Sequence, residues 1–155
     1  MLTPELQKQH EEHMKRLEQA YADNEYQRKL QKYYSMLEEA NQSYSVLNSL
    51  NMFDEEHSQK LIDHCEKWAI LEEEIRTKRF YYEGYPFLES PPLKMLAMVY
   101  EKNAKYSAAA LACVRAIKNG YPNDGTKGGM RGRLARMIKK GKLDVTEEMK
   151  QILEI

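Results

Sequence analysis

Residues 26–47, YQRKLQKYYSMLEEANQSYSVL, decide the class of fold. Their apolar positions recur at alternating steps of four and three residues, in the order Tyr26, Leu30, Tyr33, Leu37, Ala40, Tyr44 and Leu47. This spacing predicts a long helix that packs lengthwise against another helix, within the subunit or across an interface. Several of these positions hold tyrosine, whose hydroxyl needs a polar or hydrated edge.

The chain before this segment is also predicted to be helical. Thr3-Pro4-Glu5 combines a hydroxyl cap, a first-turn proline and a carboxylate in the order that begins a helix. The apolar stripe that follows is thin, so this helix packs on a partner, frays, or does both. Asp23-Asn24 either breaks the helix or lies on the exposed side of a longer one.

A further helix is predicted after Asp54, which caps a stretch that opens with two glutamates. Its buried stripe consists of Leu61, Ile62, Cys65, Trp68, Ala69 and Ile75. Glu72–Arg76 and Glu74–Lys78 are favourable pairs four residues apart, and we place both pairs on the solvent side.

Ser90-Pro91-Pro92 begins another helix, with a cap followed by prolines at positions that tolerate them. We predict that this helix continues to Asn119-Gly120, where Pro122 follows. Apolar or small side chains occupy nearly every side of it, and a helix that is apolar all round is buried all round. Because a chain of 155 residues offers only one modest core, this surplus predicts contacts with neighbouring copies of the chain.

The C-terminal third is predicted to be a flexible glycine-rich loop, GYPNDGTKGGMRG at 120–132, leading into a basic amphipathic helix around Met130–Lys140. Gly141 stops that helix, and Thr146 caps a short last one. No strand-like alternation or repeat occurs in the sequence. We therefore predict an all-α antiparallel helical hairpin or bundle, with residues 1–119 as an oligomerisation domain and 120–155 as the loop, basic helix and terminal helix.

The formal net charge is zero, but charge is divided along the chain. Residues 1–90 carry 11 Lys/Arg against 18 Asp/Glu, a net charge of −7, whereas residues 111–142 carry 9 against 1, a net charge of +8. This asymmetry favours a protein whose basic end, residues 111–142, binds a polyanion, whereas residues 1–90 form an acidic body. The alternative is that the basic end docks on the acidic body of a neighbouring subunit.

Six cations of the loop and basic helix are the candidate nucleic-acid-binding residues: Lys127, Arg131, Arg133, Arg136, Lys139 and Lys140. They spread around a helix that an apolar stripe can anchor, so we expect them to contact phosphates and not base edges. Docking as a helix-turn-helix is disfavoured because Glu147 and Glu148 stand at the start of the second helix. The alternative is a solvated basic face.

No sequence pattern matches a nucleotide-binding loop, a metal site or an enzyme active site. Gly120-x4-Gly125-Thr126-Lys127 follows a helix and has threonine and lysine exchanged relative to a phosphate-binding loop. His10-x2-His13, Asp54-x2-His57 and His64 are interpreted as exposed side chains and not as metal ligands. We therefore expect no enzyme activity, no cofactor and no metal.

The compartment is predicted from two features. Cys65 and Cys113 lie among apolar neighbours, which is typical of small buried hydrophobes in a reducing compartment. No apolar run is long enough to span a membrane, and the first 25 residues mix charged and apolar positions, unlike a signal peptide. We expect a cytoplasmic protein without membrane contact.

Two motifs carry a resemblance to a known family. Cys65-x2-Trp68-Ala69 lies in LNMFDEEHSQKLIDHCEKWAILEEEI at 50–75, and Ser90-Pro91-Pro92-Leu93-Lys94 lies in ESPPLKMLAMVYEKNAKYSAAA at 89–110. Together they resemble the helical hairpin of one class of bacteriophage terminase small subunit, over roughly residues 25–111. The family's Leu-Thr-Pro-Ser-type turn and arginine are replaced here by GYPNDGTKGGMRGR.

The resemblance implies a non-catalytic DNA-recognition component of a phage DNA-packaging motor. Such a protein assembles as a ring in the host cytoplasm and delivers viral DNA to the large terminase subunit. Its partners are therefore copies of itself, DNA and that large subunit. The alternative from another class is a helical protein-interaction module, a regulator or host-defence inhibitor, whose basic C-terminal end binds a protein. A metal-dependent bundle enzyme is a third.

Overall fold

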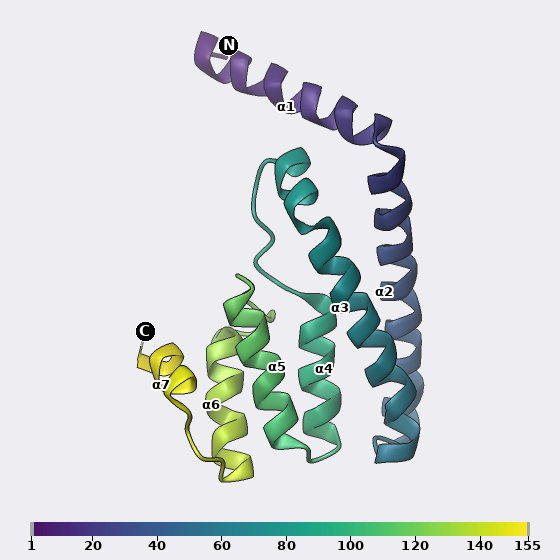
Figure 1. Cartoon of the computed structure of the whole chain (residues 1–155), viewed down its shortest axis with the longest axis vertical. Coiled ribbons are helices and arrows are strands. Elements are labelled where there is room, and N and C mark those ends of the chain that lie inside the picture. The colour runs from purple at the N-terminus through teal and green to yellow at the C-terminus, as the bar shows by residue number, and fades with distance from the viewer. Residues whose placement is uncertain (1, 155) are drawn as a thin grey trace.

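A computed structural model describes residues 2–154, and across them the protein is all-α, as predicted. The helices labelled in Figure 1 are α1 (Pro4–Ala22), α2 (Asn24–Leu50), α3 (Glu55–Glu83), α4 (Pro91–Lys102), α5 (Tyr106–Lys118), α6 (Gly129–Gly141) and α7 (Glu147–Glu154). The described residues contain no strand beyond an isolated bridge between Glu89 and Asn123. None of their helices is long and apolar enough to cross a membrane.

The first two helices are separate because Asp23 ends α1 and caps α2. Its carboxylate accepts hydrogen bonds from the Tyr26 amide at 3.1 Å and from Lys78 Nζ and the Tyr82 hydroxyl at 2.7 Å each. The bond from Lys78, followed by that from Tyr82, lowers the pKa of Asp23 to about 2. These bonds tie the α1–α2 corner to the end of α3, and α1 projects from it as an arm (Figure 1).

Helices α2 and α3 pack lengthwise in antiparallel orientation (Figure 1). The heptad positions from Tyr26 to Leu47 are all buried or half-buried in the core, so the predicted seam packs within the subunit. Trp68 is fully buried on α3, and its ring centre lies 5.6 Å from that of Tyr33. The predicted stripe of α3 is confirmed, since all six of its residues are buried.

The prediction of one helix from Pro91 to Lys118 is wrong, because the structure has two helices there, α4 and α5. The chain turns between them at Ala104, whose φ of 55° lies in the left-handed region. The two helices fold against each other, and α3 and α6 contact their other sides. No glycine or proline marks this turn in the sequence. The apolar surplus that predicted neighbouring subunits is thus largely buried within the chain.

Helix α6 belongs to the same core. Met130, Leu134 and Met137 are fully buried, which confirms the predicted apolar stripe, and they face α5. The helix ends at Gly141, followed by Lys142 with a left-handed φ of 49°. Thr146 then caps α7 by accepting a hydrogen bond from the Met149 amide. Residues 129–154 therefore pack on the body formed by the earlier helices.

The glycine-rich loop before α6 is held by specific bonds, although its composition predicts flexibility. Asp124 is 1 % exposed and accepts hydrogen bonds from the Thr126 amide at 2.9 Å and from the Thr126 hydroxyl. The Asn123 amide donates to the Leu88 carbonyl oxygen at 2.9 Å. A Cβ at Gly129, where φ is 63°, would lie 2.6 Å from the Pro122 carbonyl oxygen. The loop is therefore attached both to α6 and to the connection between α3 and α4.

Candidate functional site

The six predicted cations have different surroundings. Lys127, Arg131, Arg136, Lys139 and Lys140 are exposed, whereas Arg133 is buried, with only 8 % of it exposed. Arg131 donates to the Leu153 carbonyl oxygen of α7 at 3.1 Å. Lys127 and Lys139 form no ion pair with any described residue. We call the five exposed cations the α6 cation face.

Glu101 of α4 is the acidic residue beneath this face. It lies 3.4 Å from Arg133, 3.3 Å from Arg136 and 2.7 Å from Lys140. Partial burial acts to raise the pKa of Glu101, but hydrogen bonds from Lys140 and Arg136 outweigh it and lower the pKa. Glu101 therefore stays ionised and shares its single charge among three cations.

Arg133 forms a buried ion pair with Asp124. Its Nε donates to Asp124 Oδ2 at 2.9 Å, and the side chains of Arg133 and Asp124 are 8 % and 0 % exposed. Burial acts to raise the pKa of Asp124, but bonds from Thr126 and Arg133 outweigh it and hold the pKa below its ordinary value. Arg133 thus lies where it fastens the loop to α6, beneath the surface that a phosphate would meet.

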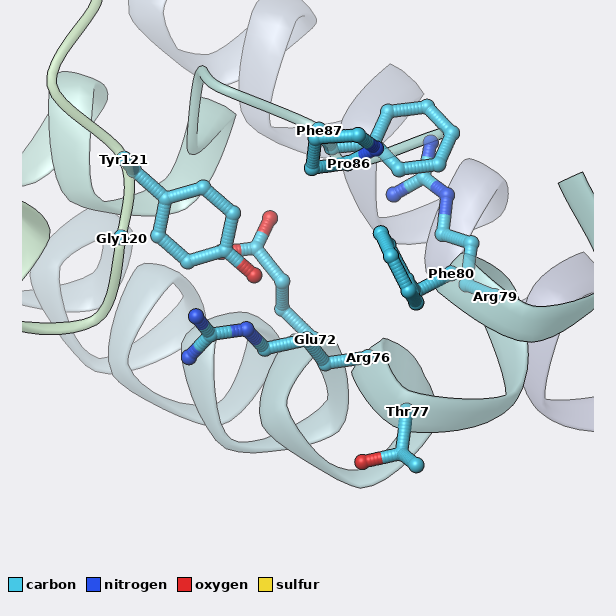
Figure 2. A pocket seen from close by; sticks show the side chains of 9 residues that line it. All are labelled: Glu72, Arg76, Thr77, Arg79, Phe80, Pro86, Phe87, Gly120 and Tyr121. Carbon is cyan, nitrogen blue, oxygen red and sulfur yellow. The ribbon is translucent and has the colours of Figure 1, made fainter. Parts of the chain in front are cut away.

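A second candidate site is a cavity of about 310 Å³, bordered by α3, the connection before α4 and the loop after α5 (Figure 2). Its lining includes the carboxylate of Glu72, two arginines and three aromatic rings: Arg76, Arg79, Phe80, Phe87 and Tyr121. We call it the Glu72 cavity. The sequence did not predict it, because its walls come from three separate parts of the chain.

The placement of Glu72 on the solvent side of α3 is wrong. Glu72 is 3 % exposed, and its two carboxylate oxygens accept hydrogen bonds from the Tyr33 hydroxyl at 2.7 Å and from the Ser90 hydroxyl. Ser90 also caps α4, so this carboxylate joins three helices. The sequence holds a signal for this burial, because Glu72 stands four residues after Trp68 and three before Ile75, on the same helical face.

Burial of Glu72 raises its pKa, although the bonds from Ser90 and Tyr33 act in the opposite direction. Burial also raises the pKa of the Tyr33 hydroxyl, and the nearby Glu72 charge adds to the effect. Tyr33 consequently remains a proton donor to Glu72 at any physiological pH. Both oxygens of Glu72 are therefore occupied by hydroxyl groups of the chain itself.

The arginines of the cavity lie over aromatic rings. The guanidinium carbon of Arg76 is 5.1 Å from the centre of the Tyr121 ring, and that of Arg79 is 3.5 Å from the centre of Phe87. Arg79 also donates to the Tyr34 hydroxyl at 3.3 Å. A guanidinium stacked in this way is held in position and retains N–H groups at its edge for an anion.

The histidines and cysteines have structural surroundings. His57 is exposed and contacts its cap residue Asp54 at 2.7 Å, whereas a ring nitrogen of His64 contacts the Met36 carbonyl oxygen at 2.8 Å in a half-buried position. The described residues contain no group of three or more potential ligands placed to hold a metal. Cys65 and Cys113 are buried, as predicted, and burial raises the pKa of each thiol to about 12.

No protein-family model, curated protein or solved structure matches this chain. Two features of the molecule itself therefore bear on function. One is the α6 cation face, which the sequence predicted in outline. The other is the Glu72 cavity, which only the packing of the helices creates.

Proposed function

We propose that this protein is a non-catalytic DNA-binding protein that contacts phosphates through the α6 cation face. The observation that carries this proposal is the excess of positive charge there: of the five exposed cations only Arg136 and Lys140 pair with a carboxylate of residues 2–154, and both pair with Glu101. Phosphate contacts by lysine and arginine release counterions from DNA, and this release supplies most sequence-independent affinity. Arg133 and Asp124 neutralise each other beneath the face and take no part.

The two exposed cations that pair with Glu101 remain able to contact DNA. The side chains of Arg136 and Lys140 are each 45 % exposed. If Arg136 and Lys140 turn to phosphate oxygens, Glu101 keeps Arg133 as its partner at 3.4 Å, so its carboxylate is not left unpaired. Arg131 and Lys139 stand eight residues apart on the outer side of the same helix and extend the face along its length.

The resemblance to phage terminase small subunits extends this proposal from DNA binding to a role in DNA packaging. The protein would then be the DNA-recognition component of a packaging motor, would form a ring in the host cytoplasm, and would deliver DNA to the large terminase subunit. Exposed apolar side chains on α1 and at the α3–α4 corner support such an interface: Leu6, Met14, Tyr21, Tyr81 and Tyr85. Arg16 lies 5.4 Å from the Tyr81 ring, so the two patches are neighbours.

Changing Arg136 and Lys139 to alanine together is expected to reduce the salt dependence of DNA binding. Each phosphate contact contributes about 0.9 to the slope of log affinity against log salt concentration, so the slope should fall by about 2 per engaged subunit. The measurement is a titration of duplex DNA at several salt concentrations. Because both side chains are exposed, the thermal stability of the variant should stay close to that of the wild type.

The matched control is Arg28→Ala with Lys32→Ala, which removes two exposed cations from the acidic body on α2. This control should keep the wild-type slope. If the α6 variant also kept the wild-type slope, the α6 cation face would not be a phosphate-binding surface, and the proposal would fail.

Light scattering of the purified protein is expected to give a mass that is a multiple of 18.3 kDa. Leu6→Glu with Met14→Glu should lower that mass, because both residues lie exposed on the arm α1. Leu111→Glu is the control, since Leu111 is similarly exposed on α5, outside the α1 and corner patches. A monomeric mass for the wild-type protein at micromolar concentration would remove the ring from the proposal.

The second candidate function is a protein-interaction module, and the order of the helices favours it. From α2 to α6, each helix packs chiefly on helices adjacent to it in the chain. Successive antiparallel helices of this kind are typical of α-solenoids, whose extended surfaces bind other proteins. In that case the α6 cation face would bind an acidic protein partner, and the α6 variant would bind DNA as the wild type does.

A further inference from the structure

The Glu72 cavity brings cations and aromatic walls together. Figure 2 shows that Arg76 extends toward Tyr121 and Arg79 toward Phe87, so their guanidinium groups lie in different parts of the cavity wall. Gly120 makes room for the first of these, because a Cβ at that position would lie 2.7 Å from Arg76 Nη2. Packing against Tyr121 and Phe87 therefore holds Arg76 and Arg79 in these orientations.

Neither arginine forms an ion pair with Glu72, although the charge of Arg79 acts to lower the pKa of this carboxylate. Both oxygens of Glu72 already accept hydrogen bonds from Tyr33 and Ser90. Arg79 forms no ion pair with any described residue, and Arg76 has only the distant contact of 3.6 Å with Glu73 on the solvent side. Two guanidinium groups without close carboxylate partners attract an anion, and their planar N–H forks suit a phosphate.

The aromatic part of the cavity is open to solvent. Phe80 lines it with 52 % of its surface exposed, which is a large apolar area for a side chain at a cavity wall. Pro86 and Phe87 continue this wall beside it (Figure 2). An exposed aromatic face of this kind stacks on a planar ring, and stacking of a nucleobase contributes about 1–3 kcal/mol.

We propose that the Glu72 cavity binds a mononucleotide, with its base against Phe80 and its phosphate on the guanidinium group of Arg76. A phosphate monoester carries about −1.5 to −2 charges at neutral pH, and a guanidinium group binds such a group through charge-assisted hydrogen bonds. The volume of about 310 Å³ agrees with the lower end of small-ligand sites. The nucleotide is either a free nucleoside monophosphate or the 5′-terminal nucleotide of a strand. This site is independent of the α6 cation face.

The test is equilibrium dialysis of the full chain with AMP, adenosine and inorganic phosphate as separate probes. We expect AMP to bind at least about tenfold more tightly than either partial ligand, because only AMP engages both Arg76 and the Phe80 ring. Arg76→Ala should weaken AMP binding by about tenfold or more through loss of a charge-assisted contact. Equal binding of AMP and phosphate, or unchanged binding by this variant, would overturn the proposal.

A second variant distinguishes a loss of AMP binding from a loss of folding. Phe80 lines the cavity with 52 % of its surface exposed, so Phe80→Ala should remove the stacking ring while both arginines remain. This variant should melt like the wild type and lose AMP binding. Arg28→Ala, which removes an exposed arginine from α2, should bind AMP normally, as should Arg136→Ala with Lys139→Ala. AMP binding by Phe80→Ala that equals wild-type binding would place the base elsewhere and contradict the proposal.

The two sources of the nucleotide are separated by comparing TMP with a 5′-phosphorylated oligothymidylate of roughly four nucleotides. Tighter binding of the oligonucleotide, lost in Phe80→Ala, identifies a strand end as the ligand. Equal or tighter binding of TMP identifies the free nucleotide. Both results support a mononucleotide site, and failure of every nucleotide to bind would refute it.

Discussion

Replacing Trp68 with alanine is expected to lower the free energy of unfolding by about 3–5 kcal/mol, the largest effect of any single truncation on α3. Trp68 is fully buried, and its ring centre lies 5.6 Å from that of Tyr33 in the seam between α2 and α3. Alanine would leave a cavity that the surrounding helices cannot fill. For a domain of this length the loss corresponds to a fall in Tm of about 6–20 °C.

Unfolding of this variant is followed by circular dichroism, because Trp68 is the sole tryptophan of the chain and its fluorescence disappears with it. Trp68→Phe is the matched control. It retains most of the buried ring and removes an indole N–H that has no hydrogen-bond partner, so its effect should be much smaller. A Tm for Trp68→Ala equal to that of the wild type would contradict the placement of this side chain in the core.

Replacing Arg133 with alanine is expected to cost about 3–5 kcal/mol as well, although for a different reason. The substitution leaves the carboxylate of Asp124, 0 % exposed, without the cation that it binds at 2.9 Å. Asp124 also holds the loop through Thr126, so the attachment of the loop to α6 should weaken. The measurement is denaturant unfolding at neutral pH, where Asp124 is ionised in the native protein.

Arg136→Ala is the matched control for Arg133, because it removes an exposed arginine three residues away on the same helix. Its cost should be about 0–1 kcal/mol. The double variant Asp124→Asn with Arg133→Met should be more stable than Arg133→Met alone, since no unpaired charge stays buried. Equal costs for Arg133→Ala and Arg136→Ala would show that Arg133 belongs to the surface and not to a buried pair.

Helix positions and caps were predictable from the sequence, because they depend on residues close together in the chain. Asp54 and Ser90 each accept a hydrogen bond from the amide three residues later, as a cap residue does. The stripe of α6 was predicted for the same reason, since Met130, Leu134 and Met137 recur at the helical period. The positive end of the chain was also visible as an uncompensated run of lysine and arginine.

The turn at Ala104 and the burial of Glu72 were not predicted. Asn103-Ala104-Lys105 contains residues that a helix tolerates, so only the gain from packing α4 against α5 explains the turn. Glu72 was interpreted as a solvent-side residue from its charge and from Arg76 four residues later. Its hydroxyl partners come from residue 33 and residue 90, which no local pattern connects to it.

The sequence by itself determined the all-α class, the caps and stripes of most helices, and the division of charge between the two ends of the chain. These features arise from interactions within one or two helical turns. Tertiary structure alone decided which cations are exposed and which are buried, because Arg133 and Arg136 look equivalent in the sequence but only Arg133 forms the buried pair with Asp124. It also created the Glu72 cavity, since burial and long-range hydrogen bonds depend on which helices pack together.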